Sequence, residues 1–97
     1  MKIFKRLSRS VKGRVAIITG AGSGMGEATS KVFASEGVKV VVSDMNFDEV
    51  QRVSNEIEES GRESMPFMLD VTNSDSINKC IEATIEKYKS IDFVINN

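Results

Sequence analysis

The chain has no histidine or tryptophan, and its 97 residues include one cysteine, one tyrosine and one proline. Because Cys80 is the only cysteine, an intrachain disulfide is excluded, and without histidine the chain offers no ligand set typical of a zinc site. We expect Cys80 to behave as a small buried apolar residue. We also expect the protein to be cytoplasmic, in a compartment where thiols stay reduced.

Long apolar runs are missing as well. No stretch approaches the roughly 18 apolar residues that a membrane-spanning helix needs, so no membrane span is predicted. A net charge of −1 gives the chain no general affinity for nucleic acid. Hydrophobic residues make up 40% of the chain and charged residues 28%, which is typical of one small globular domain.

Acidic residues are absent before Glu27, whereas lysines and arginines are frequent near the N-terminus. We interpret residues 1–10 as a basic lead-in and residues 11–97 as the N-terminal part of a single domain. An organelle presequence or a membrane-surface arm is an alternative, but the segment is short and has no apolar core of a secretion signal.

The most informative segment is the glycine-rich run at residues 19–26, TGAGSGMG. It follows the apolar, strand-like residues 15–18 and precedes a helix-like stretch at residues 27–36. Glycines in such a turn let the backbone approach a ligand closely, and the first N–H groups of the helix then point at an anion. The arrangement predicts a phosphate-bearing ligand, although a merely flexible loop is the alternative.

The glycine spacing decides between the known phosphate loops. A P-loop needs Lys-Ser or Lys-Thr after its last glycine, and here Glu27 follows Gly26. The G-x-G-x-x-G pattern would need glycine at Met25 or at Glu27. The spacing that fits is T-G-x-x-x-G-x-G, starting at Thr19, and it is similar to that of the short-chain dehydrogenase/reductase family.

Further positions carry the same resemblance, which covers roughly residues 8–97. Asp44 ends the strand-like residues 38–43, where a dinucleotide fold needs an acid for the ribose hydroxyls. Asp70-Val71 resembles the family's pair beside the adenine ring, and Asn96-Asn97 resembles the start of its N-N-A-G element. The resemblance implies a cofactor site formed by Gly20, Ser23, Gly24, Met25, Gly26, Asp44, Asp70, Val71 and Asn97.

Asp44 also bears on the choice of cofactor. A carboxylate accepts a hydrogen bond from the ribose 2′-hydroxyl of NAD but repels the 2′-phosphate of NADP. Relatives that prefer NADP usually have a basic residue at positions held here by Ser23 and Met45-Asn46. NAD is therefore the predicted cofactor in preference to NADP. The alternative is that Asp44 is an ordinary turn residue or helix cap.

The family's proton-transfer pair, Y-x-x-x-K, is not found in these residues. Asp92 stands four positions after Tyr88, which instead continues a helix-spaced apolar stripe beginning at Ile77. No catalytic residue is predicted. The resemblance implies that an intact protein transfers a hydride between a nicotinamide cofactor and an alcohol or carbonyl substrate, and that intact relatives form homo-oligomers. The alternative is a stand-alone, non-catalytic nucleotide-binding or interaction module.

Strand-like and helix-like segments alternate along the chain, which predicts a parallel sheet with right-handed crossovers. The expected fold is α/β, a Rossmann-type doubly wound sheet truncated to about four strands in the order 3-2-1-4 and three helices. We expect Pro66 at the start of the third strand, at a sheet edge. Thr72 and Asp75 predict a capping box at the start of the third helix.

Overall fold

The computed structural model describes residues 11–97, so the basic lead-in at residues 1–10 lies outside the described part. Strands and helices alternate as the sequence predicts. In chain order they are β1 (Val15–Ile18), α2 (Gly24–Ser35), β2 (Lys39–Asp44), α3 (Phe47–Glu59), β3 (Ser64–Met68), α4 (Ser74–Tyr88) and β4 (Phe93–Ile95).

All four strands are parallel, and the sheet order is β3-β2-β1-β4. The predicted order and fold class are therefore confirmed. In the register, Ile17 of β1 lies opposite Val41 of β2 on one side and Val94 of β4 on the other. β2 and β3 lie on one side of β1, and β4 lies on the other side. The point where the strand order reverses is therefore between β1 and β4, beside the glycine loop.

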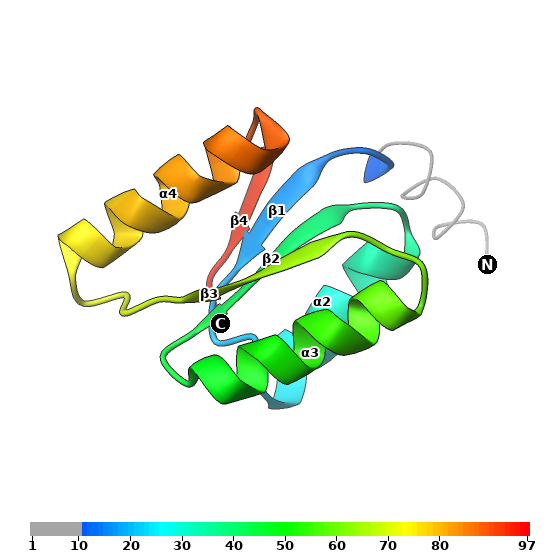
Figure 1. The fold of residues 1–97 in the computed structure, drawn as a ribbon, viewed down its shortest axis with the longest axis horizontal. Coiled ribbons are helices and arrows are strands. Elements are labelled where there is room, and N and C mark those ends of the chain that lie inside the picture. Colours follow the sequence, from blue (N-terminus) through cyan, green and yellow to red (C-terminus); the bar gives the residue numbers. More distant parts are fainter. Residues whose placement is uncertain (1–10) are drawn as a thin grey trace.

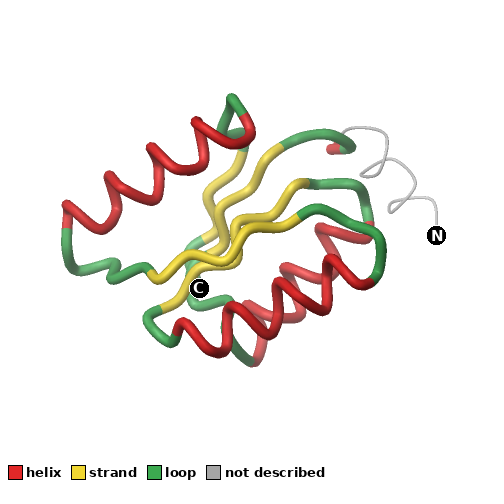
Figure 2. Tube along the Cα trace, viewed as in Figure 1, coloured by secondary structure: helices red, strands yellow, loops and turns green. Residues whose placement is uncertain are grey.

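Helices α2 and α3 cover one face of the sheet, and α4 lies on the other (Figures 1 and 2). On the first face, alternate strand residues such as Ala16 and Val40 pack with Ala34 of α2 and Val53 of α3. On the second face, Ile17, Val41 and Leu69 pack with Cys80. All four residues of β1 are buried, because this strand has helices over both of its faces.

Helix α4 does not begin with the predicted capping box. Its N-cap is Asn73, whose side chain accepts a hydrogen bond from the Ser76 N–H at 3.1 Å. The Thr72 hydroxyl instead donates to the Asp70 carboxylate at 2.6 Å, so it is not available to cap the helix. The prediction of a cap at Thr72 was wrong because Asn73, one position later, is also a favourable N-cap residue, and its amide oxygen accepts the helix N–H instead.

Pro66 also differs from expectation, because it lies in the middle of β3 rather than at its start, opposite Val42. β3 is an edge strand, as predicted. Successive residues of a strand point their N–H groups alternately to its two sides, and the N–H of Leu69 donates to Asp44 O of β2. Pro66 lies three positions before Leu69 and therefore points the other way. The nitrogen of Pro66 faces away from β2, where no ladder bond is lost.

Candidate functional site

The glycine loop joins β1 to α2 at the carboxyl edge of the sheet. Gly20 and Gly24 have φ of +60° and +57°, in the left-handed region that favours glycine. Position 26 requires glycine for a different reason: a Cβ there would collide with Gly20 O and lie 2.6 Å from Asn97 Nδ2. The loop is therefore packed directly against the end of β4.

The N-terminus of α2 is left open toward solvent. Its N-cap Ser23 is extended and forms no side-chain cap, whereas Asn46 and Asn73 cap α3 and α4. In the described part of the chain, the N–H groups of residues 24–26 have no protein acceptor, and the first backbone bond of this turn runs from Glu27 N to Ser23 O. Three converging donors at the positive end of a helix form a binding site for an anion.

Asp44 lies next to this loop at the end of β2. Its Oδ2 accepts a hydrogen bond from Gly22 N–H at 3.1 Å, and its Oδ1 lies 3.4 Å from Asn46 N. An ionised carboxylate has about four acceptor positions, so Asp44 can still accept bonds from a ligand's hydroxyls. The N-cap of α3 is Asn46, so Asp44 does not have the helix-capping role that was its alternative.

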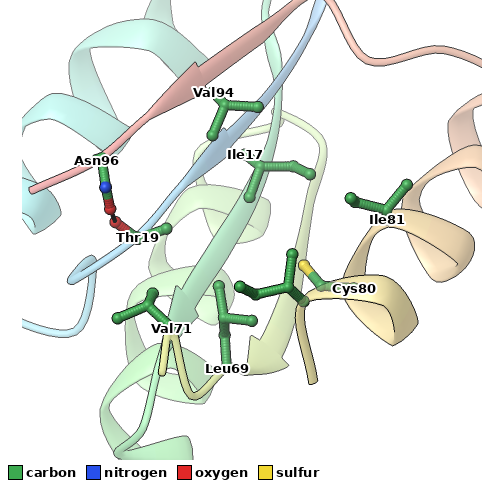
Figure 3. A pocket seen from close by; sticks show the side chains of 9 residues that line it. Ile17, Thr19, Leu69, Val71, Cys80, Ile81, Val94 and Asn96 are labelled. Carbon is green, nitrogen blue, oxygen red and sulfur yellow. Dashed lines mark hydrogen bonds between the residues drawn. The ribbon is translucent and has the colours of Figure 1, made fainter. Parts of the chain in front are cut away.

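Thr19 fastens the end of β4 to the loop. Its hydroxyl donates to Asn96 Oδ1 at 2.6 Å (Figure 3). The same hydroxyl accepts from Asn97 N–H at 3.1 Å. Its backbone N–H donates to Ile95 O at 2.9 Å. These bonds bring Asn97 against Gly20, where a Cβ on the glycine would lie 3.2 Å from Asn97 Cβ. Thr19 was predicted as part of the glycine motif but not as the residue that positions Asn97.

Asp70 and Val71 lie on the loop after β3. Asp70 Oδ1 accepts from the Thr72 hydroxyl and from its backbone N–H at 2.9 Å, and these bonds lower the pKa of the Asp70 carboxyl. Val71 is 53% exposed and lines an apolar pocket of about 200 Å³ on the α4 side of the sheet (Figure 3). The lining residues are Ile17, Thr19, Leu69, Val71, Ile77, Cys80, Ile81, Val94 and Asn96.

A network of ion pairs joins α2 to α3 beside the glycine loop. Arg52 pairs with Glu27 at 2.8 Å, with Glu49 at 3.0 Å and with Glu56 at 2.8 Å, and Lys31 pairs with Glu27 and Glu56. Hydrogen bonds from Arg52 and Lys31 lower the pKa of Glu27 to about 2. This network was not predicted from the sequence, although the spacing of Glu49, Arg52 and Glu56 along one helix was an available signal.

A sequence model of the short chain dehydrogenase family matches residues 14–97. The chain belongs to this family. It is 37% identical to the 3-oxoacyl-(acyl-carrier-protein) reductase FabG of Thermotoga maritima over 87 residues, which are 90% of this chain and 35% of that protein. It is 36% identical to the 7alpha-hydroxysteroid dehydrogenase of Escherichia coli, over 98% of this chain and 37% of that protein. The chain thus spans about a third of the length of these curated relatives.

Solved structures of relatives share the fold. A hydroxysteroid dehydrogenase from Escherichia coli superposes with a TM-score of 0.88 at 36% identity, over 90% of this chain and 37% of that one. A short chain dehydrogenase/reductase from Burkholderia phymatum in complex with NAD gives 0.83 at 31% identity, over 86% of this chain and 30% of that one. The family binds nicotinamide cofactors, and the open helix end and Asp44 are the features of this chain that suit one.

The structure places the nine predicted cofactor residues in two groups. Five of them meet at the glycine loop and its contacts: Gly20, Gly24, Gly26, Asp44 and Asn97. Ser23 and Met25 are exposed at the open end of α2 in the same region. Asp70 and Val71 stand on the neighbouring loop, and their contact with an adenine ring stays a prediction. No helix within residues 11–97 is both long enough and apolar enough to cross a membrane.

Proposed function

We propose that residues 11–97 form the N-terminal part of a single Rossmann-type domain that binds NAD. The observation that carries this proposal is the uncapped first turn of α2, with its free N–H groups, beside the Asp44 carboxylate. The pyrophosphate would lie on Gly20 and on residues 23–26, the adenosine ribose against Asp44, and the adenine near Asp70 and Val71. Asn97 lies on the opposite side of the loop, where the nicotinamide end would be held.

The bound cofactor would supply the hydride chemistry, and the residues of this chain would supply binding and orientation. We propose that a longer protein carrying this domain transfers a hydride between the nicotinamide and an alcohol or carbonyl substrate. The relatives' names as dehydrogenases and reductases support this class of reaction. Structures of relatives with NAD and with NADH support the choice of NAD, and the free, buried Cys80 suits the cytoplasmic location that we also propose.

Replacing Asp44 by alanine tests the ribose assignment. Loss of a charge-assisted hydrogen bond should weaken NAD binding by about 1.5–3 kcal/mol, while loss of like-charge repulsion should strengthen NADP binding. Titration calorimetry with both cofactors measures the two affinities. The matched control is Asp48→Ala, which removes an exposed acid from the first turn of α3 and should leave both affinities unchanged. Equal affinity of the parent chain for the two cofactors would contradict the assignment.

The 97-residue chain by itself is expected to show no dehydrogenase activity. Tyr88 is its only tyrosine and is half-buried against the apolar cluster on the α4 side, with its pKa raised to about 12 by burial and by nearby glutamates. A phenol in that environment is a poor proton donor or acceptor at neutral pH. The measurement is NADH formation in the presence of a panel of alcohols. Substrate-dependent turnover by the pure chain would show that another group transfers the proton.

A further inference from the structure

Arg52, in the middle of α3, makes contacts that extend beyond its own helix to the cofactor loop. Its two terminal nitrogens donate to both carboxylate oxygens of Glu27 on α2, at 2.8 and 3.1 Å. This two-pronged pairing is the geometry that fixes both the position and the orientation of a carboxylate. The same guanidinium also donates to Glu49 and Glu56 on its own helix.

Arg52 also reaches the backbone of the glycine loop. Its Nη2 lies 3.3 Å from Gly22 O, and the N–H of the same glycine donates to Asp44 at 3.1 Å. Gly22 is thus held at its carbonyl by a cation from α3 and at its N–H by the carboxylate proposed to bind the ribose. A side chain at this position would be crowded, because a Cβ on Gly22 would lie 3.0 Å from Glu49 Cβ and 3.1 Å from Asp44 Oδ2.

The position of Glu27 gives these contacts a consequence for ligand binding. Glu27 lies in the first turn of α2, and helical side chains tilt toward the N-terminus of their helix. An unpaired carboxylate there would stand near the N–H groups that are to receive a phosphate, and two negative charges a few ångströms apart repel each other strongly. The two-pronged pairing with Arg52 directs the Glu27 carboxylate toward α3, and Arg52 and Lys31 together compensate its charge.

We propose that Arg52 is a positioning residue for the pyrophosphate of the cofactor: it holds the Glu27 carboxylate away from the open end of α2 and fixes the carbonyl of Gly22. This inference rests on the proposed function, since it needs a dinucleotide at that helix end. Arg52 would not touch the ligand itself. It would act through Glu27 and through the conformation of the loop.

The experiment measures NAD⁺ binding by titration calorimetry, with the thermal midpoint of each variant recorded in parallel. Arg52→Met should weaken binding by about tenfold, because Glu27, then paired only with Lys31 of its own helix, loses the two-pronged contact that turns it away from the phosphates. Adding Glu27→Gln to this variant should return the affinity to within about threefold of the parent, since the repelling charge is gone. Adding Glu56→Gln instead removes another carboxylate that pairs with Arg52, one turn further along α3, and should restore nothing.

A second control, Lys39→Met, removes a cation that pairs with Glu63 away from the loop and should leave the affinity unchanged. If Arg52→Met does not fold, Arg52→Lys replaces it; this variant keeps the charge, loses the fork and should show a smaller loss with the same pattern of rescue. Parent-like affinity of the Arg52 variant, or equal rescue by Glu27→Gln and Glu56→Gln, would overturn the positioning role alone. Failure of the parent chain to bind NAD⁺ would overturn the proposed function and this inference with it.

Discussion

Replacing Gly26 by alanine is expected to abolish dinucleotide binding and to destabilise the chain by about 3 kcal/mol or more. The added Cβ would occupy the space of Gly20 O, a backbone atom that cannot rotate away, and would lie 2.6 Å from Asn97 Nδ2. To relieve the collision, α2 must move away from the β1 end of the loop. That movement would displace the N–H groups proposed to hold the pyrophosphate.

Two glycines with different surroundings provide the controls. Gly24→Ala lies in the same loop, at φ +57°, with nothing within 4 Å of the added Cβ, and should cost only the left-handed strain of about 1–2 kcal/mol. Gly61→Ala has similar strain at φ +88° but is far along the chain, after α3, and should leave binding unchanged. Denaturant unfolding and NAD⁺ calorimetry measure both effects. A Gly26→Ala chain that binds like the Gly61→Ala chain would show that the close contact is not required.

The sheet order and the glycine loop could be predicted because their signals are local. Residues 15–18 are continuously apolar, and such a run suits a strand that is buried on both faces. The position of Asp44 at the end of β2 followed from its distance to the glycines, because each βα unit has a nearly fixed length. The carboxyl ends of neighbouring parallel strands then meet at one edge, which brings Asp44 to Gly22.

The parts that escaped prediction depend on contacts between distant residues or on close competition between neighbours. Arg52 and Glu27 are 25 positions apart, and nothing in either local sequence identifies the partner. The Thr19 hydroxyl meets Asn96 across 77 positions, because β1 and β4 become neighbours only when the sheet reverses its order. At the start of α4 the two candidate caps are adjacent, and only the side-chain geometry decides between them.

The apolar stripe of α4 was predicted from its helical spacing, but its burial could not be read from spacing alone. Cys80 and Thr84 are almost fully buried, as expected for the side of the helix that faces the sheet. Ile81 and Ile85 from the same stripe are 39% and 47% exposed. α4 is the only described helix on its side of the sheet, whereas α2 and α3 together cover the other side (Figure 1). A single helix cannot cover a four-stranded face.

The open side of the sheet leads to an expected behaviour in solution: the chain should bind a hydrophobic dye and self-associate. Val94 is 65% exposed on the edge strand β4 and lines one apolar pocket together with Ile81 and Val71. Apolar patches next to an unpaired strand edge promote association between chains. Light scattering should therefore give a heterogeneous mass above 10.7 kDa, and dye fluorescence should rise on addition of the folded chain.

A paired substitution locates the effect on this surface. Val94→Lys together with Ile81→Lys should reduce both the dye signal and the mass, since each removes an exposed apolar side chain from the open face and adds a like charge to it. Val32→Lys is the matched control: Val32 is 46% exposed but lies on α2, on the covered side of the sheet, and its replacement should change neither signal. A parent chain that is a uniform monomer, melts cooperatively and binds no dye would show that α4 and the strand side chains close this face without help. In that case this surface would not promote association, because Val94 and Ile81 would be isolated exposed apolar side chains of the kind that most folded domains tolerate.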